Sequence, residues 1–289
     1  MAGPATTTGK VKNEAAQAAN AAQQAVDNPW AERFIRLGYM VRGLLYVVVG
    51  VLALQVAAGA GGKTTTKSGA IGTLAGEPFG KFLLIVIAVG LAGYALWGFI
   101  RALFDPLHRG TDAKGIAQRI GYVVSGLSYG ALFLVTMNFL TGHGGGNSQG
   151  SGAQTWSAAL LQQPFGPWLV GLIGLIGMAG GAGQIWQGVT TKFKDDWHLA
   201  DMNADEQKAV IWAGRIGMAA RGVVFIILGF FVLEAALQAD PKQAQGLDGA
   251  LQALAHQPFG PWLLGLVALG LVAFGLYSML AGRWIRVTH

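Results

Sequence analysis

The sequence predicts an all-α integral membrane protein with six transmembrane helices, arranged as three pseudo-threefold repeats of a helical hairpin. A threefold motif pattern and the apolar composition are the observations behind this prediction. Hydrophobic residues make up 53% of the chain and charged residues 12%, and no Lys, Arg, Asp or Glu occurs in residues 120–191. Soluble globular domains carry about 25% charged residues, so this composition excludes that class.

Two motifs recur three times in the same order. The first, Arg-[Leu/Ile]-Gly-[Tyr/Met], begins at Arg36, Arg119 and Arg215. The second, Pro-Phe-Gly-x-[Phe/Trp]-Leu, opens a long apolar run each time, and its first three residues are Pro78, Phe79 and Gly80, then Pro164, Phe165 and Gly166, then Pro258, Phe259 and Gly260. The spacing makes each unit a pair of helices rather than a short solenoid repeat.

The repeat boundaries follow from these motifs. We expect repeats at 29–110, 111–196 and 197–289, each with two transmembrane helices, behind a disordered cytoplasmic tail at 1–28 that has few large apolar side chains. A membrane helix needs about 20 apolar residues to cross about 30 Å of hydrocarbon. Six segments meet this requirement: 35–57, 79–103, 120–141, 165–189, 212–237 and 259–282.

The segment between the two helices of each repeat has helical spacing of its own. Leu74, Leu160 and Leu254 each stand four residues before the motif proline. We expect short amphipathic interfacial helices in these outer loops. Because proline is favoured in the first turn of a helix, we also expect each motif proline to lie in the first turn of the returning helix.

The distribution of Lys and Arg predicts the orientation, since cytoplasmic loops retain positive charge. With the N-terminus inside, sixteen of the 20 Lys and Arg residues fall on the inner side. We therefore expect a multi-pass protein of the bacterial inner (plasma) membrane with both termini cytoplasmic; an internal photosynthetic membrane stays open. The net charge of +6 is then mostly a topology signal and gives no reason to expect nucleic acid binding.

The paired motifs and the three two-helix units resemble the bacterial membrane family catalogued as domain of unknown function 1206. The resemblance covers about residues 33–286. It implies a bacterial integral membrane protein and carries no activity.

Polar residues in the apolar segments are candidate functional residues. Gln55, Asn138 and Glu234 each stand nineteen residues after a motif arginine, so they could form a polar ring or pore around the pseudo-threefold axis. Nineteen residues span about 28 Å of helix, however, which places them near the outer edge of the hydrocarbon, where a polar side chain is tolerated.

The arginines near the inner ends form a second candidate site. An inner vestibule could attract anions or anionic head groups through Arg36, Arg42, Arg119, Arg215 and Arg221. The alternative is that these long side chains only anchor the helix ends at the interface.

The sequence does not favour an enzyme. We find no metal-binding motif and expect no cofactor. Two Gly-x-Ser-x-Gly matches, around Ser128 and Ser148, lack the strand-to-helix turn that a serine hydrolase needs, so we interpret them as chance.

Two functions therefore remain open. The first is a non-catalytic scaffold, assembly factor or accessory subunit of a membrane complex, with membrane lipids and another membrane protein or a second copy of this chain as partners. The second is a small pseudo-threefold transporter or channel for a polar or anionic solute, since internal repeats are common among transporters.

Overall fold

The computed structural model describes residues 29–61, 63–104, 112–143, 152–197 and 199–284. The predicted tail at 1–28 lies outside the described residues. Each of the six predicted apolar segments lies in a long helix except for at most one terminal residue. These helices are α2 (Pro29–Ala57), α4 (Gly80–Phe104), α5 (Ala113–Leu140), α7 (Gly166–Thr190), α8 (Ala204–Gln238) and α10 (Gly260–Trp284). All six are long and apolar enough to cross a membrane.

In each repeat one short helix connects the two long helices, as predicted. The three short helices are α3 (Lys67–Ala75), α6 (Gly152–Leu161) and α9 (Leu247–Ala255). We call them the connector helices, and the end of the molecule that carries them the connector end. Ile71 and Leu251 are fully buried, so α3 and α9 pack their apolar faces onto the long helices.

The Pro-Phe-Gly motif forms the turn from each connector helix into the returning helix. The prediction for the prolines was wrong by two residues, because the returning helices begin at Gly80, Gly166 and Gly260. In each copy the phenylalanine takes the left-handed conformation, with φ of 65°, 61° and 60°. A Cβ on Gly80 would overlap the carbonyl oxygen of Ala75, so the chain reverses too tightly for any larger residue.

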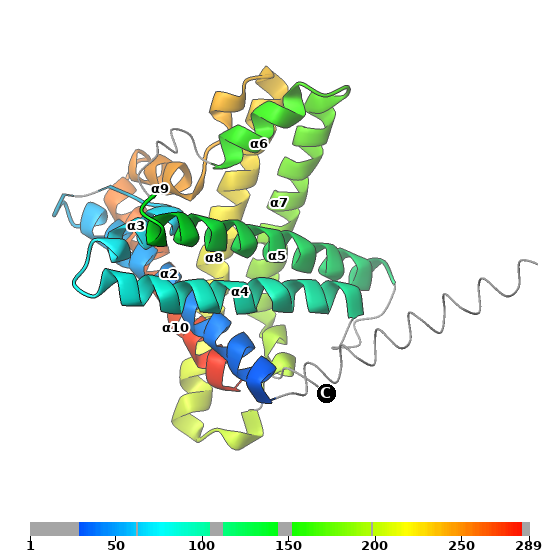
Figure 1. Ribbon diagram of the computed structural model, residues 1–289. Helices are drawn as coiled ribbons and strands as arrows, with labels where there is room; N and C mark the ends of the chain where they lie inside the picture. Colours follow the sequence, from blue (N-terminus) through cyan, green and yellow to red (C-terminus); the bar gives the residue numbers. More distant parts are fainter. Residues whose placement is uncertain (1–28, 62, 105–111, 144–151, 198, 285–289) are drawn as a thin grey trace, which may run out of the picture.

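The long helices pack most extensively across the boundaries between repeats. α4 packs on α5, α7 on α8, and α10 on α2, so each returning helix contacts the first helix of the next repeat and the last repeat contacts the first. Figure 1 shows α4 and α5 running side by side, across the direction of α7 and α8. The same contact thus occurs three times, as a pseudo-threefold arrangement requires.

Contacts within the repeats are unequal. α2 packs on α4 and α8 packs on α10, whereas α5 and α7 are not among the packed helix pairs of the described chain. The first and third hairpins are therefore closed, and the second is open.

The motif glycines show the physical basis of this difference. A Cβ on Gly38 would lie 2.8 Å from Tyr94 Cβ, and one on Gly217 would lie 2.5 Å from Phe274 Cα, so both hairpins close through a glycine. The equivalent Gly121 in the second repeat has nothing within 4 Å of its Cβ position. Small residues allow helix backbones to approach closely in lipid, and here only two of the three motif glycines are used in that way.

A cationic cavity as the candidate functional site

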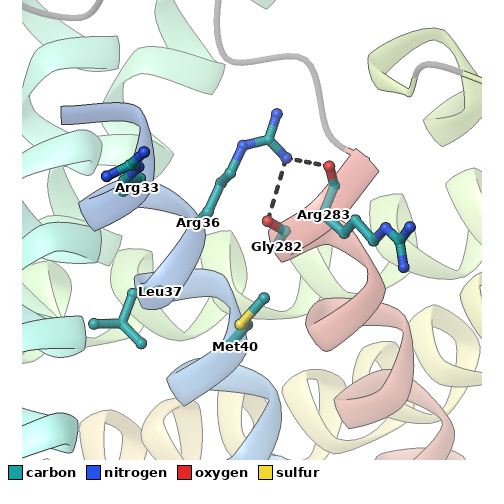
Figure 2. Close-up of a pocket in the computed structure, with 6 residues that line it drawn as sticks. All are labelled: Arg33, Arg36, Leu37, Met40, Gly282 and Arg283. Atoms are coloured by element: carbon teal, nitrogen blue, oxygen red, sulfur yellow. Dashed lines mark hydrogen bonds between the residues drawn. The ribbon is translucent and has the colours of Figure 1, made fainter. Parts of the chain in front are cut away.

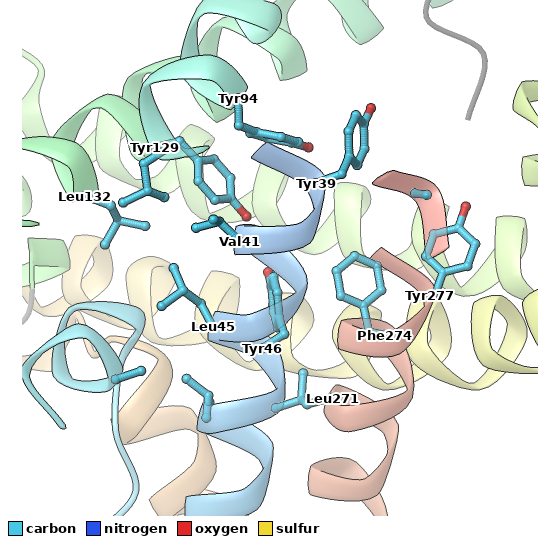
Figure 3. Packing of buried hydrophobic residues seen from close by; sticks show 14 of the residues in the cluster. Tyr39, Val41, Leu45, Tyr46, Tyr94, Tyr129, Leu132, Leu271, Phe274 and Tyr277 are labelled. Atoms are coloured by element: carbon cyan, nitrogen blue, oxygen red, sulfur yellow. The ribbon is translucent and has the colours of Figure 1, made fainter. Parts of the chain in front are cut away.

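Four cations lie among aromatic rings where the three repeats meet. Arg42 comes from α2, Lys67 from α3, Arg101 from α4 and Arg221 from α8. The rings around them include Tyr39, Tyr46, Tyr94, Tyr129 and Phe274, which we call the aromatic cluster; Figure 3 shows these five side chains, contributed by α2, α4, α5 and α10. Each of the five is at most 5% exposed, so the cluster is part of the protein core.

Arg42 points into the centre of this cluster. Its guanidinium carbon lies 4.8 Å from the centre of the Phe274 ring and 5.2 Å from that of Tyr94, and Nη1 donates a hydrogen bond to the Tyr94 hydroxyl. Arg101 is 9% exposed and lies over Tyr122 at 4.3 Å. Each such cation–aromatic contact contributes about 0.5–2 kcal/mol, more where water is excluded.

Lys67 begins α3 and reaches down to the cluster from the connector end. Its Nζ lies 4.5 Å from the centre of the Tyr46 ring and donates a hydrogen bond of 3.2 Å to the Tyr129 hydroxyl. Burial acts to lower the pKa of Lys67, but the neighbouring Tyr129 and Tyr46 hydroxyls outweigh it, so the pKa lies above its ordinary value. The side chain therefore stays an ammonium ion at neutral pH.

Arg221 also lies over the Tyr46 ring. Its guanidinium carbon lies 5.6 Å from the centre of the Tyr46 ring, 4.6 Å from that of Phe225 and 4.8 Å from that of Phe274. Its Nε is buried without a hydrogen-bond partner, and no hydrogen bond from this guanidinium is found among the described residues. An arginine carries five N–H donors, so its hydrogen-bonding capacity is open to a ligand.

Among the described residues, none of these four cations has a carboxylate within 4 Å. Among the described residues, ion pairs within 4 Å join Glu32 to Arg36 and Asp205 to Lys208, and neither pair involves the four cations. Positive charge taken out of water is costly without a counterion. The aromatic faces and tyrosine hydroxyls supply part of the compensation, and an anion would supply the remainder.

A large cavity opens beside Lys67 and Arg221. Its volume is about 1430 Å³, and α2, α3, α5, α6, α8, α9 and α10 all contribute to its lining. On the long helices the lining residues run from the middle toward the connector end, from Ser128 to Phe139 on α5 and from Arg221 to Leu228 on α8. The cavity therefore occupies one half of the molecule and ends near Tyr46 and Leu271, both visible in Figure 3.

The predicted basic ring divides into two groups with different roles. Arg36 donates to the carbonyl oxygens of Gly282 and Arg283 at the end of α10, and Figure 2 shows both bonds. Arg119 makes the equivalent contacts at the end of α4, to Ala102 at 2.6 Å and Leu103 at 3.0 Å. These motif arginines thus cap the last carbonyls of the neighbouring repeat's helix.

The other predicted arginines differ from these two. Arg215 lies over Trp212 at 5.2 Å, while Arg42 and Arg221 lie in the aromatic cluster. The structure therefore does not bring the five arginines together in a single inner vestibule. Arg221 is the one member of that set that lines the large cavity.

The predicted polar ring is not assembled in this structure. Gln55 and Asn138 are exposed, and Glu234 accepts a hydrogen bond of 3.1 Å from Gln238 on its own helix. None of the three lines the cavity, and no hydrogen bond joins them. A role in solute passage stays a prediction without geometric support. Ser128 does line the cavity, but its hydroxyl donates to the Val124 carbonyl at 2.8 Å within α5.

Sequence reasoning missed Lys67, Arg101 and the tyrosines. A signal for the tyrosines was present, because Tyr46, Tyr129 and Phe225 each stand ten residues after a motif arginine. Lys67 carried no such signal: it occurs in one repeat alone, and its approach to the cluster depends on how α3 folds over the bundle. In the described residues, no group of three or more His, Asp or Glu side chains is placed to hold a metal ion.

Comparison with known proteins places the chain in a family. A family model described as Domain of Unknown Function (DUF1206) matches three segments, residues 37–105, 120–191 and 216–284. The chain is 38% identical to "Uncharacterized protein YxxB" of Bacillus subtilis (strain 168) over 260 residues, which cover 90% of this chain and 93% of that protein. No solved structure matches significantly. With three matched segments and a relative of nearly full length, the chain belongs to the DUF1206 family of multi-pass membrane proteins.

Proposed function

We propose that this protein is a non-catalytic membrane protein that binds an anionic ligand in the cavity beside Lys67 and Arg221. The observation that carries the proposal is the presence of two cations in the cavity wall with no carboxylate of the described residues within 4 Å of either. The single carboxylate in the lining is that of Asp248, so the lining is net positive. This favours the solute-binding hypothesis over a purely structural role.

A thermal-shift experiment tests anion binding directly. Inorganic phosphate should raise the melting temperature of the purified protein relative to chloride at equal ionic strength, since a ligand at about 100 times its Kd stabilises by about 2.7 kcal/mol. The Lys67→Gln variant should lose this increment. An equal response to phosphate and chloride, in wild type and variant alike, would argue against the proposal.

The distribution of positive charge also favours an orientation. We propose that both termini are cytoplasmic and that the connector end faces outward, as the distribution of Lys and Arg indicates. The chain has no cysteine, so single cysteines report topology without background. Lys63→Cys should react with a membrane-impermeant maleimide in intact cells, and Lys208→Cys only after permeabilisation. The reverse pattern would invert the orientation.

An accessory-subunit function is the second candidate. α5 and α7 have the smallest buried share of the six spans, 17% each, and they flank the open hairpin, so a helix of another membrane protein could fit there. This candidate predicts a stoichiometric partner in mild-detergent purification from the native membrane. It also predicts that Ile176→Arg, at an exposed position of α7, releases that partner.

A further inference from the structure

We propose that the ligand is an anionic amphiphile, with its charged group between Lys67 and Arg221 and its apolar chain along α5 and α8. This inference rests on the proposed anion-binding function and names the chemical class of the ligand.

The charged group would be held by two converging cations. Lys67 Nζ lies 4.5 Å and the Arg221 guanidinium carbon 5.6 Å from the centre of the Tyr46 ring, and both residues line the cavity, from different helices. Lys67 uses one of its three donors on Tyr129, and Arg221 has no acceptor among the described residues. A phosphate, sulfate or carboxylate group can accept from both side chains at once.

An apolar strip leads from these cations toward the connector end. On α5 it includes Ala131, Val135 and Phe139, and on α8 it includes Val224 and Leu228. From Ser128 to Phe139 the strip is about 16 Å long at the rise of an α-helix. Such a strip offers nothing to a small hydrated anion, whereas an alkyl chain would bury apolar surface along it at about 25 cal/mol per Å².

The size of the cavity agrees with a ligand larger than a simple anion. Its volume of about 1430 Å³ exceeds the range of about 300–1,000 Å³ that is common for small-molecule sites. Lys67 and Arg221 lie where the cavity ends near Tyr46, the apolar strip extends away from them, and Asp248 lines the cavity from α9 at the connector end. The two cations and the strip match a molecule with an anionic group at one end and an apolar chain.

The open second hairpin supplies a way in from the bilayer. α5 and α6 line the cavity, and α7 does not close against α5. Gly130, in the half of α5 that lines the cavity, has nothing within 4 Å of its Cβ position. The missing α5–α7 packing therefore leaves this side of α5 open to a chain-bearing ligand from the bilayer.

Native mass spectrometry of the full-length protein in a neutral detergent tests this inference. The probes are dodecyl phosphate, inorganic phosphate, and dodecylphosphocholine, which has the same chain on a zwitterionic head. We expect dodecyl phosphate to bind at least about tenfold more tightly than either of the others, because only this probe uses both the cations and the strip.

Two variants and one control assign the binding to the cavity. The Lys67→Gln/Arg221→Gln variant should bind dodecyl phosphate at least about tenfold more weakly than the wild type. The control variant Lys208→Gln/Arg215→Gln also removes one lysine and one arginine, but from positions of α8 that do not line the cavity. It should bind dodecyl phosphate like the wild type. Ala131→Phe should weaken the binding of dodecyl phosphate and leave the binding of inorganic phosphate unchanged. The larger side chain fills the apolar strip but does not touch the two cations.

The outcomes separate this inference from the proposed function. If inorganic phosphate binds as tightly as dodecyl phosphate and Ala131→Phe changes neither, the ligand is a small anion: the amphiphile is overturned and anion binding stands. If dodecylphosphocholine binds as well as dodecyl phosphate, the site recognises the alkyl chain alone, and recognition of an anionic head group is refuted. If no probe distinguishes the cavity variants from the control, both proposals fail.

Discussion

The second repeat contains the same motifs as the first and third repeats, but its two long helices do not pack against each other as theirs do. In the outer two, the motif glycine brings the paired helices into contact, at Gly38 against Tyr94 and at Gly217 against Phe274. In the second, Gly180 stands where Tyr94 and Phe274 stand, and neither it nor Gly121 has a neighbour within 4 Å of its Cβ position. A small residue is thus a requirement for close packing and not its cause, because a larger partner must be present to fill the contact.

The difference also bears on the candidate binding region. The closed hairpins supply all four cations and most of the aromatic cluster, whereas the open hairpin supplies Tyr129 and the α5 and α6 walls of the cavity. Internal repeats fix the framework, and departures from repetition create the site. Four predictions test or sharpen this comparison.

The largest expected effect is on the motif glycines. Gly217→Ala and Gly38→Ala should destabilise the protein by about 1–3 kcal/mol, because the added methyl meets the Phe274 or Tyr94 backbone or Cβ within 3 Å. Gly121→Ala should be neutral or slightly stabilising, since alanine favours the helix and meets nothing. Thermal unfolding in detergent measures all three, and equal losses would show that the second hairpin is closed as well.

The motif arginines should show the next largest effect. Arg36→Ala and Arg119→Ala each remove hydrogen bonds from a cation to helix-end carbonyls and should cost about 1–2 kcal/mol. Arg215→Ala should cost less than about 1 kcal/mol, because this side chain only stacks on Trp212 at a position where Trp212 is 59% exposed. The same unfolding assay tests this order, and a loss at Arg215 equal to the others would remove the distinction.

The smallest expected effect is on the pH dependence of stability that Lys67 contributes. The pKa of Lys67 is raised in the folded protein, so its contribution to stability is fully present below the unfolded-state pKa of about 10.4 and is lost as pH rises through the folded value. Between pH 6 and pH 9 the stability difference between wild type and Lys67→Gln should therefore be constant. A difference that shrinks steadily across this range would place the Lys67 pKa below its ordinary value.

Much of the fold could be predicted from the sequence, and the site could not. Long apolar runs and repeated motifs fix which segments are helices, since a chain in lipid must satisfy its backbone within each helix. The motif roles needed the structure, because Arg36 caps a helix 246 residues away and only packing brings Gly282 to it. Lys67 could not be recognised at all, since its neighbours Tyr46 and Tyr129 lie on two other helices.

Repetition in the sequence also misled in one respect. It predicted equivalent positions for Gln55, Asn138 and Glu234 and suggested a ring, but equivalence in sequence gives a shared site only if the three repeats close around one axis. The open second hairpin breaks that condition. Arg42 and Arg221 share a repeat position and both lie 4.8 Å from the centre of the Phe274 ring, whereas the second repeat has Ser125 at that position.

Disulfide cross-linking tests the open second hairpin most directly. Gly121 and Gly180 occupy the positions of Gly38 and Tyr94, whose Cβ positions lie 2.8 Å apart, so a closed second hairpin would bring them near the 3.5–4.5 Å that a disulfide needs. The positive control is Gly171→Cys/Ala236→Cys, which joins α7 to α8. It should cross-link under a membrane-permeant oxidant, because these Cβ positions lie 3.6 Å apart. The structure predicts that Gly121→Cys/Gly180→Cys stays reduced under the same conditions; rapid formation of that disulfide would contradict the account.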